Sequence, residues 1–311
     1  MAPLILRRVL LLVPNLLLLT FVVFAVMTTW LGSPSVLMLG RDATPEAVHD
    51  MDARFGFDQP VPVQYGRWIG AALRGDFGRS FTTQQPVAAM VGPAIPVTLE
   101  LAFGAIVVAA AAAVGVNSLV VGRRVIGPVV TAASVVGVTV PNFMLGAILI
   151  YVLAIRLRWL PTTGWSPWGQ GVGPHLLHLL MPVLTLCAFY ASAFSTVYRA
   201  EYRHAERQIF VRAARAKGLT ETRVSFRHIL PNAVLPLITY AGLSLGQLVG
   251  GAVVTETVFS IPGVGRLLVS AVTSYDYPVI LAVTLMILVA VAAANLLADL
   301  VYARVNPQVR L

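Results

Sequence analysis

The sequence predicts an all-α membrane protein with about six transmembrane helices. Of its 311 residues, 58% are hydrophobic and only 11% are charged, whereas soluble proteins are about 25% charged. Apolar runs long enough to cross a hydrocarbon core of about 30 Å recur along the chain. We expect the transmembrane spans near residues 9–30, 97–121, 128–155, 179–198, 233–254 and 279–302.

The first apolar run begins like a secretory signal peptide, because Arg7 and Arg8 precede it. Signal peptides, however, have a shorter apolar core that ends at a small-residue cleavage site. The run from Val9 to Trp30 has 22 residues, and no such site follows it. We therefore expect a first transmembrane helix here.

The basic residues predict the orientation, because short cytoplasmic loops are enriched in lysine and arginine. The net charge of +9 is thus typical of a membrane protein with basic loops rather than of a nucleic-acid-binding protein. Fourteen of the 22 basic residues would face the cytoplasm, namely Arg7, Arg8, Arg123, Arg124, Arg304, Arg310 and eight within 199–231. Both termini are then cytoplasmic, and the exceptions are Arg156, Arg158 and Arg266. The five tryptophans all fall on the outer side, near the interface that favours them.

Residues 31–96 form the one polar, soluble-looking region. Six acidic residues lie in it, and it is interrupted by Pro34, Pro45, Pro60, Pro62, Pro86, Pro93 and Pro96. We expect short helices and turns on the outer side of the membrane. A docking surface for a cargo-delivering protein and a passive cap both fit this region, and both stay open at this point.

The predicted fifth span contains Gly242, Gly246 and Gly250, with a glycine at every fourth position. This spacing gives one smooth helix face that a neighbouring helix can approach closely. The polar residues of the span are Thr239, Ser244 and Gln247. A pore lining and hydrogen bonds between helices explain them equally well.

Ionisable residues within membrane spans usually indicate function, and here they are sparse. Glu100 lies near the outer end of the second span, Glu256 just beyond the fifth, and Asp299 near the inner end of the sixth. None falls at mid-bilayer, and no inverted repeat is visible. Both observations disfavour a self-sufficient secondary carrier, so energy would enter from outside the chain.

Enzyme and metal-site alternatives are weaker. The five histidines fall outside the predicted spans and no Gly-x-Ser-x-Gly turn occurs, which disfavours a membrane hydrolase. The single cysteine, Cys187, excludes an internal disulfide and a multi-cysteine metal site. His175 and His178 could present two imidazoles to a metal, but two ligands make a weak site and an interfacial loop is the favoured interpretation.

The segment 199–231 is basic although it lies between two apolar spans. It contains eight of the 22 basic residues, including the only lysine, Lys217. Helical spacing of Phe210, Ala213, Ala214 and Lys217 predicts a short helix, with Gly218 as its left-handed cap. Thr220 can N-cap a second short helix, and Pro231 suits the opening of the fifth span. A helix that docks on a partner and a basic stretch on anionic lipid are both open, and periodicity alone favours the lipid.

A motif in this segment resembles the cytoplasmic motif of ATP-binding-cassette (ABC) importer permeases. That motif is Glu-Ala-Ala, three residues, glycine, nine residues, isoleucine, any residue and Leu-Pro. The residues that match at the right spacing are Ala213, Ala214, Gly218, Leu230 and Pro231. Arg212 replaces the glutamate and His228 the isoleucine, as suits the dipeptide/oligopeptide/nickel branch.

The resemblance to this branch covers nearly the whole chain. The stretches similar to it are 55–60, 64–65, 75–80, 98–101, 141–143 with Gly146, 255–265, 276–278 and 306–307. The longest of them reads Thr-Glu-Thr-Val-Phe-Ser-Ile-Pro-Gly-Val-Gly. The departure at 31–34, where the branch usually has Pro-Gly-Asp-Pro, concerns only a local turn.

The resemblance implies a type I ABC importer permease in a bacterial inner membrane. Members pair with a second permease chain, two cytoplasmic ATPases and an extracytoplasmic substrate-binding protein. ATP and Mg²⁺ bind the ATPases, and this chain has no phosphate-binding glycine–lysine loop, so we expect it to hold no cofactor and to catalyse no reaction. The implied cargo is a dipeptide or oligopeptide. Nickel or another small solute is the alternative, and a secondary carrier is less favoured.

The resemblance also assigns roles to residues. The helix over 208–219 would seat in an ATPase groove through Arg212, Ala213, Ala214, Arg215, Lys217, Gly218 and Leu219. We expect the translocation path or gate at Gln247, Glu256 and Phe259, with a locally paired interface carboxylate as the alternative for Glu256. Helix packing is expected at Gly242, Gly246 and Gly250. The expected domains are 1–30 (first helix), 31–96 (extracytoplasmic segment), 97–302 (permease domain, including loop 199–231) and 303–311 (cytoplasmic tail).

Overall fold

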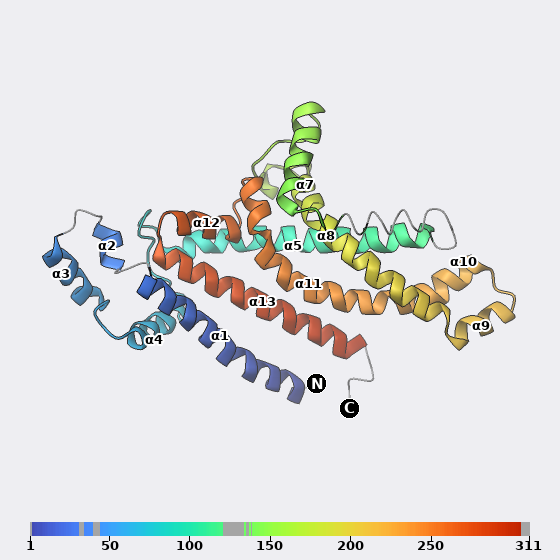
Figure 1. Ribbon diagram of the computed structural model, residues 1–311, viewed down its shortest axis with the longest axis horizontal. Coiled ribbons are helices and arrows are strands. Elements are labelled where there is room, and N and C mark those ends of the chain that lie inside the picture. Colours follow the sequence, from blue (N-terminus) through green and yellow to red (C-terminus); the bar gives the residue numbers. More distant parts are fainter. Residues whose placement is uncertain are drawn as a thin grey trace. The chain divides into compact units, whose positions relative to one another are not determined.

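Helices make up most of the computed structural model of this chain (Figure 1). The structure describes residues 2–30, 34–39, 44–120, 134, 137 and 139–305. Within these residues the one strand-like pairing is an isolated bridge between Arg79 and Pro86. The predicted all-α fold is therefore confirmed.

The chain divides into two compact units. The first comprises Met1–Thr98 and Pro262–Ala292, and the second comprises Leu99–Ile261 and Ala293–Leu311. Because the division falls inside two long helices, α5 (Val87–Val120) and α13 (Tyr277–Val305) contribute residues to both units.

Five helices in the described part of the chain are long and apolar enough to cross a membrane. They are α1 (Ala2–Trp30), α5, α8 (Val172–Glu206), the run Glu221–Val258 and α13. They correspond to five of the six predicted spans. For the span predicted at 128–155, the structure describes α7 (Asn142–Leu149) and its π-helical continuation η1 (Ile150–Arg156), whereas most of the preceding part lies outside the described residues.

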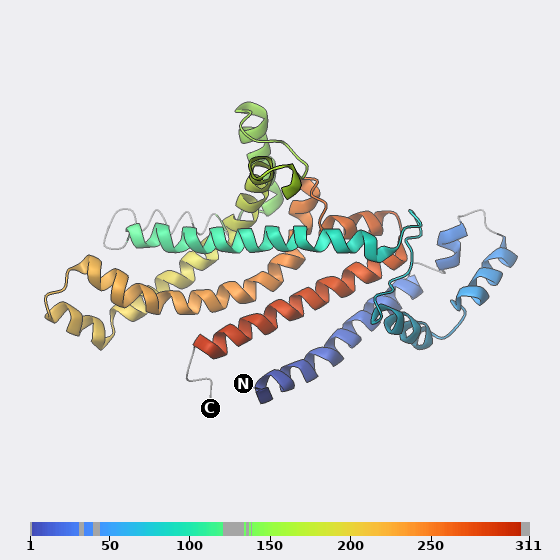
Figure 2. The same cartoon turned by 180° about the vertical axis from the view of Figure 1, so that it is seen from behind.

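The helix that contains the second predicted span starts earlier than the span itself, because α5 begins at Val87 rather than near residue 97 (Figure 2). Pro93 and Pro96 were expected to interrupt this segment, but both lie inside α5. The helix persists because Val87, Val91 and Ala94 lie on one helix face and are buried in a core with α12 (Val264–Thr273) and α13. Both prolines are exposed, and the packing compensates for the backbone donors that they lack.

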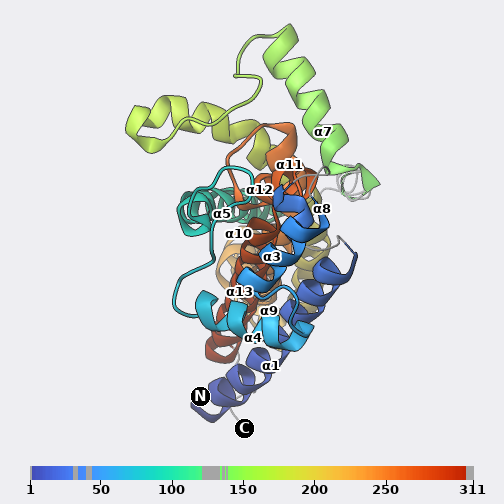
Figure 3. The ribbon, with the colours of Figure 1, turned by 90° about the vertical axis from the view of Figure 1, so that its left-hand side faces the viewer.

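In the first unit, three short helices follow α1, as predicted for this region (Figure 3). They are α2 (Pro34–Leu39), α3 (Pro45–Phe55) and α4 (Val61–Ala72). Tyr65 joins α4 to α1: its ring lies 5.2 Å from that of Phe21, edge to face, and its hydroxyl donates to the Leu17 carbonyl at 2.9 Å. Aromatic pairs in this geometry are favourable beyond the area that they bury.

A buried carboxylate orders the end of this region. Asp276, which is 3% exposed, lies between α12 and α13. It accepts hydrogen bonds from the Ser80 hydroxyl and from the backbone N–H groups of Phe81 (3.0 Å) and Thr82 (3.4 Å). Two of the similar stretches noted in the sequence, 75–80 and 276–278, are thereby joined.

In the second unit, α8 packs against α11 (Leu230–Val258) and α7 (Figures 1 and 2). Phe194 of α8 is fully buried, and its ring lies 5.6 Å from that of Tyr240 on α11, edge to face. The Tyr198 hydroxyl is 2.9 Å from the Ser118 hydroxyl of α5. The core of this unit thus forms around the middle of α8.

The second short helix predicted after the basic turn is not a separate element. α10 (Glu221–Val224) passes through a π-helical turn, η3 (Ser225–Ile229), directly into α11. Pro231 lies in the first turn of α11, where it was predicted. The preceding Leu230 N–H bonds to the Ser225 carbonyl, five residues back. Since proline has no N–H to donate, this wider turn absorbs the irregularity without ending the helix.

Candidate functional site

The basic segment lies at the end of a helix longer than a membrane requires. At 1.5 Å per residue, the 35 residues of α8 extend about 50 Å, which is about 20 Å more than a hydrocarbon core. The final part of α8, to Glu206, falls within the loop predicted at 199–231 and is helical. α9 (Ile209–Ala216) follows after one turn and lies beside α10 (Figure 1).

Gly218 ends α9 in the predicted left-handed conformation, with φ +76°. Its N–H donates to the Arg215 carbonyl at 2.9 Å, and the Leu219 N–H donates to the Ala214 carbonyl at 3.4 Å. This pair of bonds is the Schellman motif, which satisfies the last carbonyls of a helix. Thr220 lies at the N-cap position of α10, but its side chain makes no capping hydrogen bond.

α9 has an inward face and an outward face. Val211 is fully buried and Ala214 is 6% exposed, so both contribute to the packing of the hairpin. The outward residues include two apolar ones, Ile209 at 81% and Phe210 at 43% exposure. Also exposed are Arg212, Ala213, Lys217 and Gly218, whereas Leu219 is half-buried. An apolar patch flanked by basic side chains is therefore exposed on α9.

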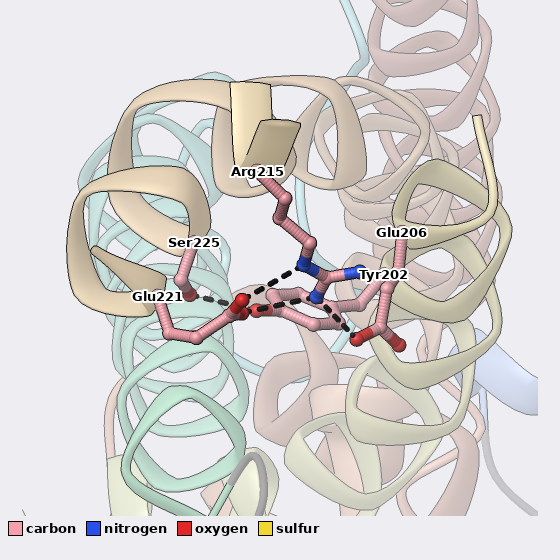
Figure 4. A network of polar contacts seen from close by, with 5 residues as sticks. All are labelled: Tyr202, Glu206, Arg215, Glu221 and Ser225. Carbon is pink, nitrogen blue, oxygen red and sulfur yellow. Dashed lines mark hydrogen bonds and ion pairs between the residues drawn. The ribbon is translucent and has the colours of Figure 1, made fainter. Parts of the chain in front are cut away.

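Arg215 bonds within the chain (Figure 4). Its Nε donates to Glu221 Oε1 at 2.8 Å and its Nη2 to Glu221 Oε2 at 3.0 Å, a bidentate pair. The same Nη2 donates to Glu206 Oε1 at 3.2 Å. These hydrogen bonds raise the pKa of Arg215, and the bond from Arg215 lowers the pKa of Glu221. Three elements, the end of α8, α9 and the start of α10, are thereby linked through one guanidinium.

A second contact joins α8 to the helix that continues into α11. The Tyr202 hydroxyl lies 2.7 Å from the Ser225 hydroxyl (Figure 4). Tyr202 is 5% exposed, so this contact is shielded from solvent. The phenol can donate its hydrogen to Ser225 or accept one from it.

The three residues predicted for the path or gate do not share one environment. Gln247 is exposed on α11, whereas Glu256 is fully buried and Phe259 is 2% exposed. Glu256 was placed just beyond the fifth span, but it lies inside α11, because the helix extends to Val258. Phe259 follows the helix end and packs beside Gly146 of α7.

The three glycines of α11 also differ. A Cβ on Gly242 would lie 3.0 Å from the Cβ of Ala298, so a neighbouring helix approaches closely there. Gly246 is buried, whereas Gly250 is exposed with open space around it. Gly242 also lines an apolar groove of about 430 Å³ between α5 and α11, together with Phe103 and Leu245.

The two histidines considered as metal ligands lie in the first turns of α8, not in a loop. Both ring nitrogens of His175 are engaged, Nε2 with Glu100 Oε1 at 2.8 Å and Nδ1 with the Ser166 carbonyl at 2.7 Å. His178 is exposed, and its Nδ1 bonds to the Pro174 carbonyl. Among the described residues, no group of three or more histidine, cysteine or acidic side chains could hold a metal.

Sequence reasoning missed the residues that hold α9 in place. Glu206 and Tyr202 were treated as part of a polar loop, yet both lie in the final turns of α8 and contact the hairpin. It also missed Ile209, the most exposed apolar residue of α9. An available signal was the position of two bulky apolar residues, Ile209 and Phe210, at the start of a strongly basic segment.

Long apolar helices and a basic hairpin between two of them define a multi-pass membrane protein. The chain belongs to the family of binding-protein-dependent transport system inner membrane components, which residues 104–311 match. Residues 1–102 match the corresponding N-terminal family of these membrane components. The predicted membership in the ABC importer permeases is confirmed.

Named relatives match nearly end to end. The chain is 35% identical over 281 residues, 90% of each protein, to the probable peptide ABC transporter permease protein y4tP of Sinorhizobium fredii. It is 35% identical over 308 residues, 98% of each protein, to the glutathione transport system permease protein GsiC of Salmonella paratyphi A and of Escherichia coli K12.

A solved structure supports the fold. It is described as the crystal structure of an amino acid ABC transporter with histidines, and it matches with a TM-score of 0.53. The match covers 70% of this chain and 94% of that chain at 14% identity. The predicted type I permease fold is consistent with this likeness.

Proposed function

We propose that this chain is a permease subunit of an ATP-driven peptide importer, and that it couples to a cytoplasmic ATPase through α9. The observation that supports this most directly is the outward face of α9. Ile209 is 81% exposed and Phe210 is 43% exposed on a short helix beyond the membrane. Apolar residues so exposed are typical of a surface that a partner covers.

The chemistry of this face defines the partner's groove. Ala213 leaves room for close approach, and Arg212 and Lys217 flank it with positive charge. A groove with an apolar floor and an acidic rim would complement these residues. Ala214 and Leu219 act from the inner side by packing the hairpin, and Arg215 and Gly218 fix its geometry.

The hairpin can transmit a displacement because both its ends are parts of long helices. Arg215 ties α9 to Glu206 at the end of α8 and to Glu221, from which the helix continues into α11. A push on α9 would therefore act on α8 and α11 together, and these two helices pack against each other. Such a linkage suits the rigid-body helix movements of transport cycles.

The complex would contain a second permease chain, two cytoplasmic ATPases and an extracytoplasmic binding protein. ATP and Mg²⁺ would bind the ATPases, and this chain would hold no cofactor and catalyse no reaction. Both termini would then be cytoplasmic, so that α9 faces the ATPases. The domain boundaries at 30, 96 and 302 belong to this proposal.

The cargo is proposed to be a peptide. Relatives at 35% identity are named for peptide and for glutathione transport, and glutathione is itself a tripeptide. These names favour a peptide over the nickel alternative. Gln247 and Glu256 are proposed to border the path and Phe259 to gate it. The buried Gly246 is proposed to allow close helix packing within the chain, and the exposed Gly250 close helix approach within the complex.

The proposal is tested by the uptake of labelled peptide into proteoliposomes that contain the complete complex, with this chain, the second permease chain, the two ATPases and the binding protein. Dipeptides, glutathione, pentapeptides and nickel are compared, with and without ATP and the binding protein. We expect uptake of one peptide class that requires both. Uptake that persists without ATP would exclude the proposed coupling.

A matched pair of variants tests the docking face itself. Ala213→Trp places a bulky side chain on the outward face of α9, whereas Ala200→Trp makes the same change at an exposed alanine of α8. We expect Ala213→Trp to abolish peptide uptake while the chain still inserts in the membrane, and Ala200→Trp to transport. Equal uptake by both would contradict docking through α9.

A further inference from the structure

An exposed turn in the first unit is held by several hydrogen bonds of its own. Residues 80–85, which we call the 80–85 turn, lie just before α5. The Ser80 N–H donates to the Gln85 carbonyl at 3.0 Å, and the Gln84 N–H donates to the Ser80 carbonyl at 3.0 Å. The Thr83 N–H donates to the Ser80 hydroxyl at 2.9 Å. The backbone of the turn is therefore closed on itself.

A buried carboxylate fixes this turn to the segment between α12 and α13. Asp276 accepts a hydrogen bond from the Ser80 hydroxyl. The same carboxylate accepts from the N–H groups of Phe81 at 3.0 Å and of Thr82 at 3.4 Å. Because Tyr275 directly precedes Asp276, its backbone lies beside the turn, and its side chain is 53% exposed. We call the 80–85 turn together with Tyr275 the turn surface.

Two residues of the turn surface have a left-handed backbone. Gln84 has a φ of +59° and Tyr275 a φ of +55°, although neither is a glycine. This conformation is unfavourable for a residue with a Cβ, so the surrounding contacts must maintain it. At Gln84 the contact is with Arg79, whose Nη1 donates to the Gln84 carbonyl at 2.9 Å. Such strain is typical of sites where a defined geometry serves a function.

The exposed side chains of the turn surface are neutral and polar, with one aromatic ring. Thr82, Thr83, Gln84 and Gln85 are exposed in the turn. Hydroxyl and amide groups can bond to a protein surface, and a tyrosine ring can fill a pocket at a low cost in conformational entropy. The 80–85 turn carries no charged residue, whereas surfaces that recognise anionic lipid are basic. A fluid lipid surface also requires no fixed backbone geometry, so the turn surface suits a folded protein partner.

The position of the turn surface indicates on which side of the membrane this partner would lie. α5 and α13 both begin at the turn surface, and Val87 and Val279 near their starts belong to one buried core. Since both termini are proposed to be cytoplasmic, these ends of α5 and α13 are extracytoplasmic. A surface that is already rigid loses little freedom on binding, so more of its contact energy appears as affinity.

We propose that the turn surface is the place where the extracytoplasmic binding protein docks, with Tyr275 as its anchor. The partner provides a pocket for this one ring and hydrogen-bonding groups around it. The inference rests on the proposed function and names the residues that meet this partner. It also favours a docking surface over a passive cap for the outer region, and it assigns the contacts to the 80–85 turn rather than to α2, α3 or α4.

The dependence of peptide uptake on the concentration of binding protein tests the proposal. Proteoliposomes with the complete complex receive increasing amounts of the peptide-loaded binding protein that supports uptake. We expect Tyr275→Ala to raise the half-saturating concentration about tenfold or more, as the loss of an interface hot spot does, and to leave the maximal rate nearly unchanged. The matched control is Tyr151→Ala on η1, because Tyr151 is also 53% exposed. This control should keep the wild-type half-saturating concentration.

Asp276→Asn tests whether the rigidity of the turn contributes. This variant leaves every exposed side chain of the turn surface in place, but its NH₂ group cannot accept hydrogen bonds from the N–H groups of the turn. We expect faster hydrogen exchange of residues 80–85. The half-saturating concentration of binding protein should lie between those of the wild type and Tyr275→Ala.

The possible failures are distinguishable. An unchanged half-saturating concentration in Tyr275→Ala, or an equal increase in Tyr275→Ala and Tyr151→Ala, would overturn docking at the turn surface and leave the proposed function standing. A lower melting temperature of Tyr275→Ala without a change in half-saturation would place Tyr275 in the lipid interface and would also overturn it. A wild-type complex whose uptake responds to no binding protein would instead refute the proposed function, and this inference with it.

Discussion

Gly218 offers the sharpest test of how α9 is held. Its φ of +76° lies in the left-handed region, and a Cβ added there would meet no atom within 4 Å. A substitution therefore changes the cost of the backbone conformation without a steric clash. For an ordinary L-residue that cost is about 1–2 kcal/mol.

This magnitude sets an order among variants. Gly218→Ala should open the turn about 5- to 30-fold more often, the ratio that corresponds to about 1–2 kcal/mol. Gly218→Asn should have a smaller effect, because asparagine tolerates the left-handed region, and Gly218→Val a larger one, because β-branched residues do not. Gly218→Trp should resemble alanine in the turn itself, yet it adds bulk at the exposed end of α9.

Two measurements separate these effects. Hydrogen exchange of a peptide covering the Gly218 turn reports how often it opens, and peptide uptake by the assembled complex reports coupling. We expect protection to decrease from glycine through asparagine and alanine to valine, and uptake to be lost in Gly218→Trp beyond the loss in Gly218→Ala. Equal protection in all variants would refute the backbone argument, and full uptake by Gly218→Trp would refute docking at this end of α9.

Two further predictions concern the brace of α9 and the packing of the proposed gate. Arg215→Glu should reduce the exchange protection of α9, and adding Glu221→Arg should restore part of it. A double variant that is no better protected than Arg215→Glu alone would show that the ion pair does not hold the helix. The pKa of Glu221 is lowered, so its contribution to the stability of α9 should be complete above the ordinary pKa range of a carboxyl group. That contribution should be lost as the pH falls through the lowered pKa. Exchange protection of α9 measured from pH 6 to pH 3 would detect the loss. Gly146→Leu should destabilise the chain by about 1–3 kcal/mol in thermal unfolding, because even a Cβ at this position would lie 3.2 Å from the Phe259 ring. Gly250→Leu, where the added side chain meets open space, should change the stability little. Equal melting temperatures of the two variants would contradict this packing.

Local rules recovered the hairpin from the sequence. Gly218 was predicted as a left-handed cap because a single glycine after a helical pattern suffices to indicate one. The apolar runs predicted the membrane helices, because their lengths match the hydrocarbon core. Both signals depend on residues close together in the chain.

The parts that were missed depend on packing. Nothing local to α5 indicates that Pro93 and Pro96 lie within it, because the helix is held by α12 and α13, which come far later in the sequence. The partner of His175 is 75 residues away, at Glu100. Hydropathy predicts which part of a helix lies in lipid but not how far the helix continues into water. The polar contacts at the two ends of α8, through Tyr202 and Glu206 and through His175, were therefore not predicted.

The contacts along α8 suggest how its two ends are related. Its middle packs through apolar residues such as Phe194, and such contacts are non-directional and tolerate small sliding. Its ends are fixed instead by directional polar contacts, through Tyr202 and Glu206 at one end and through His175 at the other. A displacement at one end of α8 is therefore transmitted along the rigid helix to the elements bonded at its other end, because the apolar contacts of its middle permit sliding. We therefore expect a displacement of α9 to change the contacts of His175 at the other end of α8, and hydrogen exchange of residues 157–171 would report that change.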